Sequence, residues 1–206
     1  MKRLILATQN VHKVREIKEI LKNLDWELIP LSELLPNFDI IEDGQSYEEN
    51  ATKKAESVAR YFNQIALAED SGLEVDALAG APGIFSARFA GEPVNYENNI
   101  KKLLELLKEA PDEKRTARFR CVCAVAIPMK STFQVELFEG ICEGQIALRA
   151  RGNQGFGYDP VFIPQGYHKT FAELDPAEKN QISHRARALR QVEIFLRKLK
   201  TAEGGS

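Results

Sequence analysis

Short apolar runs alternate with segments of helical periodicity over the first 70 residues. Residues 4–7 and 65–68 are four-residue apolar runs typical of buried strands, and residues 26–31 indicate another strand. Between the strands, apolar residues recur at three- and four-residue steps over residues 14–24 and from residue 46 to about residue 62, which predicts two amphipathic helices. This alternating order predicts an α/β domain with a partly parallel sheet.

Polar residues set the expected boundaries of these elements. Ser46 followed by Glu49 predicts a capping box at the start of the second helix. Proline, asparagine, aspartate and glycine fill residues 32–45, which predicts a loop. The Glu-Asp-Ser-Gly segment at residues 69–72 is expected to end the strand that precedes it.

The second half of the chain begins with a loop rich in glycine and proline, at residues 80–91. The elements expected after it are a helix at 96–107, a hairpin formed by 119–127 and 133–141, a strand at 161–163 and a last helix at 185–199. We find neither a repeat nor a linker between two cores. We therefore expect one two-lobed domain over residues 1–200, followed by a flexible tail at residues 201–206.

Composition narrows the classes of function. The 206 residues include 28 basic and 30 acidic side chains, a formal net charge of −2, and 44% of the residues are hydrophobic. These values are typical of a globular protein and exclude a disordered or collagen-like chain. They also exclude binding of nucleic acid through bulk positive charge, but they allow a local basic pocket for a small polyanion.

Cysteine content and hydropathy bear on the compartment. Cys121, Cys123 and Cys142 are odd in number and have apolar neighbours, which favours small buried side chains over disulfides or a zinc site. The apolar run at the N-terminus is too short for a signal peptide, and no stretch reaches the ~20 apolar residues of a membrane span. The expected compartment is the cytoplasm.

A first candidate site follows the first strand, where an anion is favoured at the N-terminus of a helix. Lys13 supplies a positive charge there. The candidate residues of this segment are Thr8, Gln9, Asn10, Val11, His12 and Lys13. The alternative is that Thr8 or Asn10 caps the helix and Lys13 is solvated, because capping explains these residue types without a ligand.

A second candidate site is the acidic pair Glu69 and Asp70. Adjacent side chains of an extended segment point to opposite faces, so we expect one of the two to enter a site. A hard cation is held there if Glu42 supplies a second carboxylate and phosphate oxygens and water complete the shell. A solvated acidic turn is the alternative interpretation.

A third candidate site is the segment from Gly155 to Pro160. Glycines on both sides of Phe156 expose its ring beside Asp159, an arrangement suited to a heterocyclic base. An aromatic loop that anchors the hairpin to the core explains the same residues without a ligand.

A fourth candidate site precedes the last helix, where Lys179, Ser183, His184 and Arg185 follow one another closely. Ser183 as a helix cap explains part of this pattern. Basic residues at a helix N-terminus oppose the macrodipole, however, and an anionic or oxygen-rich ligand would relieve that cost.

The ordered set of these clusters resembles the inosine triphosphate pyrophosphatase family, also called the Ham1-like or non-canonical purine NTP pyrophosphatases. The resemblance extends from Thr8 to the last helix, nearly the whole chain. The matching segments are Thr8-x-Asn10-x-x-Lys13, Glu42-x-Gly44, Glu49-Asn50-Ala51-x-x-Lys54-Ala55, Asp70-Ser71-Gly72-Leu73, Gly80-x-Pro82-Gly83, Ser86-Ala87-Arg88, Gly155-Phe156-Gly157-Tyr158-Asp159-Pro160 and Ser183-His184-Arg185.

The resemblance implies a mixed α/β fold with a long curved central sheet, flanking helices and two lobes around a nucleotide-binding cleft. It implies a homodimer that hydrolyses purine nucleoside triphosphates between the α- and β-phosphates. The implied substrates are ITP, dITP and XTP, with ATP and GTP rejected, and the implied role is to cleanse the nucleotide pool of deaminated purines.

The resemblance also assigns roles to residues. Glu42 and Asp70 would hold Mg²⁺, and Asp70 would be the catalytic residue that directs the attacking water, with Glu69 as a fallback base. Phosphate binding falls to Lys13 and Lys54, and base binding falls to Phe156, Asp159, Lys179, His184 and Arg185. The remaining expected substrate contacts are Thr8, Gln9, Asn10, Val11, His12, Ser71, Gly157 and Tyr158.

Two other functions stay open on the sequence. A Maf-like pyrophosphatase catalyses the same kind of reaction on other modified nucleotides, but it lacks the Gly-Phe-Gly-Tyr-Asp-Pro and Ser-His-Arg segments. A non-catalytic nucleotide sensor binds without turnover, but it does not need the carboxylate pair of Glu42 and Asp70.

Overall fold

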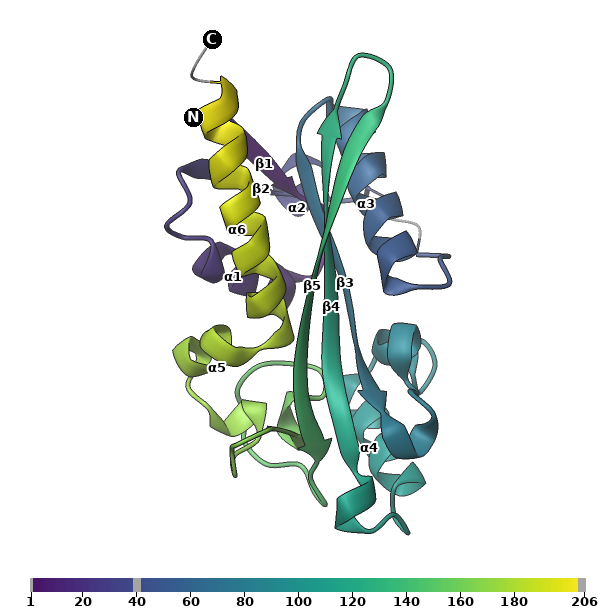
Figure 1. The fold of residues 1–206 in the computed structure, drawn as a ribbon. Helices are drawn as coiled ribbons and strands as arrows, with labels where there is room; N and C mark the ends of the chain where they lie inside the picture. Colours follow the sequence, from purple (N-terminus) through teal and green to yellow (C-terminus); the bar gives the residue numbers. More distant parts are fainter. Residues whose placement is uncertain (1, 39–41, 204–206) are drawn as a thin grey trace. The chain divides into compact units, whose positions relative to one another are not determined.

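The computed structural model describes residues 2–38 and 42–203. Its strands form one mixed sheet in the order β2-β1-β3-β4-β5-β6 (Figure 1). The strands are β1 Lys2–Leu6, β2 Trp26–Pro30, β3 Ala66–Val75, β4 Thr116–Pro128, β5 Phe133–Ile146 and β6 Phe162–Pro164. The α-helices are α1 Val11–Ile20, α2 Leu31–Leu34, α3 Tyr47–Phe62, α4 Tyr96–Leu106, α5 Pro176–Ile182 and α6 His184–Glu203. Short 3₁₀ turns are η1 Asp76–Leu78, η2 Gly83–Arg88, η3 Asp112–Lys114, η4 Asp159–Val161 and η5 Phe171–Glu173.

The chain divides into two compact units. The first unit comprises residues 1–70, 121–140 and 185–206, and the second comprises residues 71–120 and 141–184. The boundaries fall inside β3, β4 and β5 and after the first residue of α6. The single domain expected over residues 1–200 stays a prediction.

The first unit has the expected parallel strands. β1 pairs in parallel with β2 and with β3, and Leu6 lies opposite Leu67. Helices α1 and α6 lie on one side of the strands and α3 on the other (Figure 1). The core on the α1 and α6 side includes Leu4, Leu6, Ile17, Leu21, Leu67, Cys121, Cys123, Leu189 and Val192. The period-two spacing of the two cysteines therefore places both thiols in this core, as small buried side chains.

The second unit has its own core. Aromatic rings dominate it: Phe119 packs edge-on against Phe162 at 4.7 Å between centroids and lies parallel to Phe171 at 5.9 Å. Leucines from the start of this unit and from α4 complete the cluster, which includes Leu73, Leu103, Leu107, Cys142, Tyr158, Val161 and Leu174.

The structure corrects several expected boundaries. β3 extends to Val75, so Glu69 and Asp70 lie inside a strand rather than at its end. The two hairpin strands, β4 and β5, are also longer than expected. β3 extends beyond its pairing with β1 because β4 neighbours it on its other side, and a strand with a long neighbour keeps its backbone bonded past polar residues.

Two short helices were not expected. α2 occupies Leu31–Leu34 inside the expected loop, of which residues 39–41 lie outside the described residues. α5 occupies Pro176–Ile182, where the Asp175 side chain accepts from the Ala177 N–H and proline stands in the first turn. These are standard start signals that the apolar pattern alone does not reveal.

The expected capping box is half formed. Ser46 Oγ accepts from the Glu49 N–H at 3.1 Å, but the Glu49 carboxylate accepts from the Gln45 N–H at 2.9 Å. At the other end of the chain, α6 continues to Glu203, and residues 204–206 of the expected tail lie outside the described residues.

Candidate active site

Strands β1 and β3 are parallel and adjacent, so the start of α1, which follows β1, lies near the acidic pair Glu69 and Asp70 in β3. Asn10 is the N-cap, and its Oδ1 accepts from the N–H groups of His12 at 2.9 Å and Lys13 at 3.3 Å. Thr8 Oγ1 accepts from the Asn10 N–H at 3.2 Å. Gln9 Nε2 donates to the backbone carbonyl of Leu35, the residue that ends α2. The capping interpretation is therefore confirmed for Asn10, and Val11 beside it is exposed.

Lys13 is not solvated, contrary to the alternative interpretation of this segment. Its Nζ lies 3.2 Å from Glu69 Oε1, and its side chain is mostly buried. Burial by itself lowers the pKa of Lys13, but the carboxylates of Glu69, Asp70 and Glu42 together outweigh that effect and leave the pKa raised. Lys13 is therefore a fixed positive charge.

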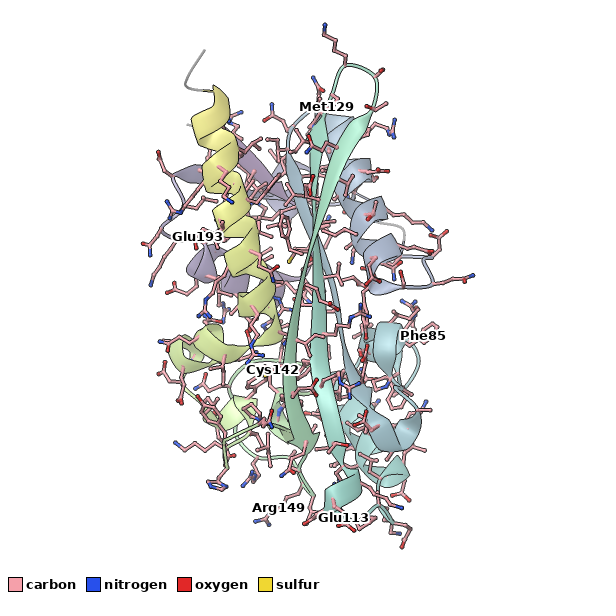
Figure 2. The ribbon with its side chains drawn as sticks, in the orientation of Figure 1. Phe85, Glu113, Met129, Cys142, Arg149 and Glu193 are labelled. Carbon is pink, nitrogen blue, oxygen red and sulfur yellow. The ribbon has the colours of Figure 1, made fainter. Side chains whose placement is uncertain are left out.

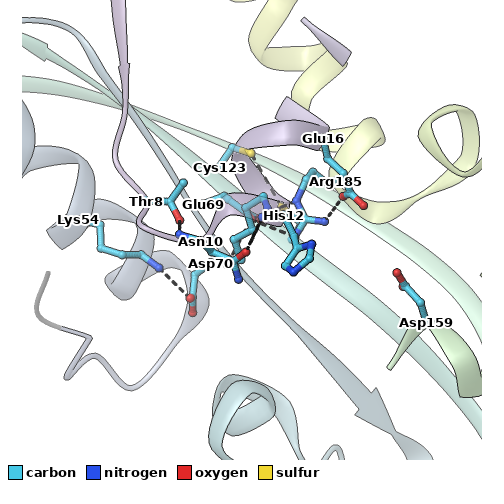
Figure 3. A network of polar contacts seen from close by, with 12 residues as sticks. Thr8, Asn10, His12, Glu16, Lys54, Glu69, Asp70, Cys123, Asp159 and Arg185 are labelled. Atoms are coloured by element: carbon cyan, nitrogen blue, oxygen red, sulfur yellow. Dashed lines mark hydrogen bonds and ion pairs between the residues drawn. The ribbon is translucent and has the colours of Figure 1, made fainter. Parts of the chain in front are cut away.

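Glu69 is the centre of a buried network that Figure 3 shows. Its Oε1 accepts from Arg185 Nε at 3.1 Å and Nη2 at 3.0 Å, and its Oε2 accepts from Cys121 Sγ at 3.0 Å. Arg185 Nη1 donates in turn to Glu16 Oε2 at 2.5 Å. Burial opposes the charge of Glu69, but Arg185 and Lys13 hold its pKa well below the ordinary value.

Two partners of Glu69, Arg185 and Cys121, have raised pKa values. Burial of Arg185 disfavours its charge, but Glu69 and Glu16 raise its pKa well above the usual range. Burial, reinforced by Cys123 and Glu69, raises the pKa of Cys121, so this residue stays a thiol and donates a hydrogen bond to Glu69. Each of the two cations, Lys13 and Arg185, is thus paired with a carboxylate.

Asp70 has a different set of partners, as the alternation of a strand requires. Lys54 of α3 is 3% exposed, and its Nζ donates to Asp70 Oδ1 at 2.9 Å and to Glu42 Oε1 at 2.7 Å (Figure 3 shows Lys54 and Asp70). Asn50, one helical turn before Lys54, donates to Asp70 Oδ2 at a long 3.3 Å. One ammonium therefore brings together two carboxylates from separate segments.

A glycine shapes the loop that carries Glu42. Gly44 N–H donates to Asn50 Oδ1 at 2.8 Å, and a Cβ at this glycine would lie 2.6 Å from the same oxygen. Asn50 thus connects the loop to Asp70, with its amide oxygen on Gly44 and its amide nitrogen on the carboxylate. This explains the Glu-x-Gly pattern at residues 42–44.

The carboxylates of Glu42 and Asp70 suit a hard divalent cation. Mg²⁺ is usually held by one or two carboxylates while water and substrate phosphates fill its remaining positions. Among residues 2–38 and 42–203, no cluster of three or more histidine, cysteine, aspartate or glutamate side chains forms a metal site. The two carboxylates therefore fit a cation that is shared with a phosphate ligand rather than one enclosed by protein.

The second unit holds the aromatic cluster. Lys179 Nζ lies 2.6 Å from Asp159 Oδ2 and 5.3 Å from the centroid of the Phe156 ring, and both charged side chains are buried. Asp159 Oδ2 also accepts from the Phe156 N–H at 2.9 Å. A Cβ at Gly155 would lie 2.0 Å from that oxygen, so the loop requires glycine at this position.

The second unit also holds four other residues that were predicted to contact the substrate, namely Ser71, Gly157, Tyr158 and His184. Tyr158 donates its hydroxyl to the Ser86 carbonyl at 2.9 Å, and burial raises its pKa. The His184 ring stacks on Phe119 at 4.6 Å between centroids. Gly157 has a φ of +61°, and Ser71 is half-buried in β3.

The sequence and the fold were compared with known proteins. The sequence model of the Ham1 family matches residues 4–195. The chain belongs to the Ham1 family. This result confirms the resemblance drawn from the ordered motifs.

Relatives in the Ham1 family match over almost their whole length. A dITP/XTP pyrophosphatase of Oceanobacillus iheyensis is 50% identical over 197 residues, which cover 95% of this chain and 98% of the relative. A dITP/XTP pyrophosphatase of Bacillus subtilis is 49% identical over 196 residues, with 95% and 98% covered. The chain is thus similar in sequence to dITP/XTP pyrophosphatases of these two bacteria.

Solved structures of the Ham1 family have the same fold. The Staphylococcus aureus Ham1 protein superposes with a TM-score of 0.84 at 42% identity and covers 96% of this chain and 99% of its own. The Ham1 protein of Coxiella burnetii gives a TM-score of 0.86 at 42% identity, with 96% and 100% covered. The expected mixed α/β class is thereby confirmed.

Three residues that contact the candidate site, Glu16, Asn50 and Cys121, were assigned no role from the sequence. Glu16 lies one helical turn after Lys13, and Asn50 lies one turn before Lys54, so helical spacing gives a signal for both. Cys121 gave no such signal. Its only mark was an apolar environment, and its contact with Glu69 joins positions 52 residues apart.

Among the described residues, no helix is both long and apolar enough to pass through a membrane.

Proposed function

We propose that this Ham1-family chain hydrolyses the non-canonical purine nucleoside triphosphates ITP, dITP and XTP to the monophosphate and pyrophosphate. Its role is to cleanse the nucleotide pool of deaminated purines. Relatives about 50% identical over nearly the whole chain carry the name dITP/XTP pyrophosphatase, which supports this substrate class. The observation that carries the reaction type is the convergence of Glu42 and Asp70 on the buried Lys54.

The first unit is assigned the triphosphate. Lys54 and Lys13 are mostly buried cations that are fixed by carboxylates, so each has a defined position from which to attract phosphate oxygens. The capped N-terminus of α1, with Thr8 and Asn10, favours negative charge beside Lys13. Gln9, Val11 and His12 belong to the same segment and are assigned to substrate binding.

Glu42 and Asp70 are assigned to Mg²⁺, since two carboxylates with room for phosphate and water match its preference. When bound, the cation would neutralise charge that develops on the phosphates. Lys54 holds both carboxylates within reach of one point. This chain thus supplies two oxygens and leaves the other positions to substrate and water.

Asp70 is assigned the attacking water, and Glu69 is not favoured for that role. Asp70 Oδ2 has a long 3.3 Å contact with Asn50, which leaves it able to accept from a water molecule. Glu69, in contrast, is 1% exposed, and both of its oxygens accept from protein groups. Its lowered pKa also makes it a weak base.

The second unit is assigned the base. Phe156 offers a ring for stacking, and the Lys179–Asp159 pair offers a donor and an acceptor beside it. In this unit His184 supplies a further donor, and Ser71, Gly157 and Tyr158 complete the proposed contacts. Arg185, which belongs to the first unit, is also proposed as a donor to the base. Hypoxanthine and xanthine have an acceptor at position 6 where adenine has a donor, and an unpaired buried donor costs about 1–3 kcal/mol.

We also propose a homodimer in the cytoplasm. Phe85 of η2 is 55% exposed in the second unit, and Met129 is 55% exposed at the hairpin turn (Figure 2 labels both). Large exposed apolar side chains are candidates for a subunit interface. Sedimentation equilibrium tests the dimer, and a monomer mass at micromolar concentration would contradict it.

The test of the proposed function is a panel of ITP, dITP, XTP, ATP and GTP, assayed with and without Mg²⁺ while both products are measured. We expect equal amounts of monophosphate and pyrophosphate from the first three, dependence on the cation, and little turnover of ATP and GTP. Preference for a modified pyrimidine nucleotide would favour a Maf-like activity. Tight binding of ITP without products would identify a nucleotide sensor.

A further inference from the structure

We propose that Glu69 is a positioning residue, which holds Lys13 and Arg185 in fixed places and transfers no proton. The proposal rests on the proposed function for the role of Lys13 in binding phosphate. The carboxylate lies between two cations from helices that are far apart in the sequence, α1 and α6. One oxygen of this buried carboxylate, Oε1, contacts both cations.

The geometry of Oε1 carries this inference. This oxygen lies 3.2 Å from Lys13 Nζ, 3.1 Å from Arg185 Nε and 3.0 Å from Arg185 Nη2. Two of these contacts form a fork with one guanidinium, which fixes the orientation of the arginine as well as its distance. Movement of the carboxylate would therefore displace both cations together.

The charges of the network balance. Lys13 and Arg185 contribute two positive charges, and Glu69 and Glu16 contribute two negative charges. A neutral side chain at position 69 would remove the carboxylate that lies next to Lys13. Arg185 would keep only its ion pair with Glu16 among the contacts described above. In a buried network such an excess of positive charge is relieved by movement toward water, which is the opposite of a fixed phosphate ligand.

The surroundings of Glu69 leave no place for a reacting water. Oε1 is shared by three nitrogens, Oε2 accepts from Cys121 at 3.0 Å, and the residue is 1% exposed. A proton acceptor must come within hydrogen-bond reach of the water that it activates. The neighbouring Asp70 meets this requirement on the opposite face of the strand.

Two adjacent thiols of β4 provide a matched pair of variants. Cys121 and Cys123 are both fully buried, lie in the same core cluster and are 3.9 Å apart at sulfur. Cys121 donates to Glu69. Cys121→Ala and Cys123→Ala therefore remove the same atoms from the same core, while the first also removes a hydrogen bond that holds Glu69.

The experiment measures two quantities for each variant: the affinity for inorganic tripolyphosphate by calorimetry, and kcat and KM for ITP. We expect Glu69→Gln to weaken tripolyphosphate binding by about tenfold and to raise KM by a similar factor, because the phosphate-binding lysine loses its anchor. The value of kcat should change much less. Glu69→Asp keeps the charge, so it should recover part of the affinity that Glu69→Gln loses.

A proton-transfer role gives the opposite pattern. If kcat falls steeply in Glu69→Gln while tripolyphosphate affinity and KM stay at the wild-type values, the positioning role is wrong. Equal tripolyphosphate affinities in Glu69→Gln and wild type would also overturn it.

The thiol variants keep the proposal testable if Glu69→Gln fails to fold. Cys121→Ala should weaken tripolyphosphate binding about two- to threefold relative to Cys123→Ala, the effect of one lost hydrogen bond on a charged group's position. Identical affinities in the two variants would overturn the proposal. If the wild-type protein binds tripolyphosphate but does not hydrolyse ITP, the proposed function fails, and the binding comparison still decides the role of Glu69.

Discussion

Glu69 and Asp70 are adjacent in β3, yet their surroundings differ in kind. Glu69 faces the core side of the first unit, where two cations and a thiol occupy both of its oxygens. Asp70 faces α3, where it shares Lys54 with the partly exposed Glu42. Two carboxylates of equal charge in one strand therefore have different partners: Glu69 contacts two cations and a thiol, whereas Asp70 contacts one lysine and one side-chain amide.

The largest effect is expected at Asp70. Asp70→Asn keeps the size of the side chain and removes its charge, so turnover of ITP should fall by about 10³-fold, in line with loss of a general base. The fold should survive because the Glu69 network lies on the other face. Steady-state kinetics and circular dichroism check both statements, and near-normal turnover would contradict the assignment.

A smaller effect is expected at Glu42, the other carboxylate on Lys54. Glu42→Gln should raise the Mg²⁺ concentration needed for half-maximal turnover by about 10- to 100-fold, because a neutral amide is a poorer ligand than a carboxylate. Asp43→Asn is the matched control, since its exposed carboxylate pairs with Lys53 instead. Equal Mg²⁺ requirements in the two variants would remove Glu42 from the cation site.

A specificity effect is expected on the Glu69 side of the comparison. Arg185→Lys keeps the charge but loses the planar fork that contacts Glu69, so the arrangement of donors changes. The ratio of kcat/KM for ITP to that for ATP should fall by about tenfold, equivalent to about 1.4 kcal/mol of lost discrimination. An unchanged ratio would show that Arg185 plays no part in the choice of base.

The smallest effect is expected in the second unit, where two glycines form a matched pair. Gly155→Ala places a Cβ against Asp159 and should lower the free energy of unfolding by about 1–3 kcal/mol. Gly157→Ala meets no atom within 4 Å and should cost about 1 kcal/mol, the price of its positive φ alone. Urea unfolding measures the difference, and equal losses would mean that the Asp159–Lys179 pair tolerates displacement.

Local sequence pattern predicted the elements whose apolar spacing is regular. The helices α1, α3 and α4 follow from such spacing, because burial of one face gives a helix a period. The parallel strands follow instead from short continuous apolar runs, which are typical of strands buried on both faces. The end of β3 was wrong since Glu69, Asp70 and Ser71 are polar. The strand continues through them because β4 lies beside β3 and keeps its backbone paired. Glu69 and Asp70 contact cations from other segments, which no local window contains.

The site was predicted from its motifs, but its internal contacts were not. Glu69 meets Arg185 across 116 positions of sequence, and Asp70 meets Lys54 across 16. A pattern shows which residue types are present but not which charges are matched. The roles of two neighbouring carboxylates could therefore be separated only when their partners were known.

The most direct test is to measure the rate of ITP hydrolysis in a single turnover, at saturating enzyme, for Asp70→Asn and Glu69→Gln. We expect the rate to fall by about 10³-fold in Asp70→Asn and to stay within about tenfold of wild type in Glu69→Gln. A rate that is retained in Asp70→Asn and lost in Glu69→Gln would contradict it.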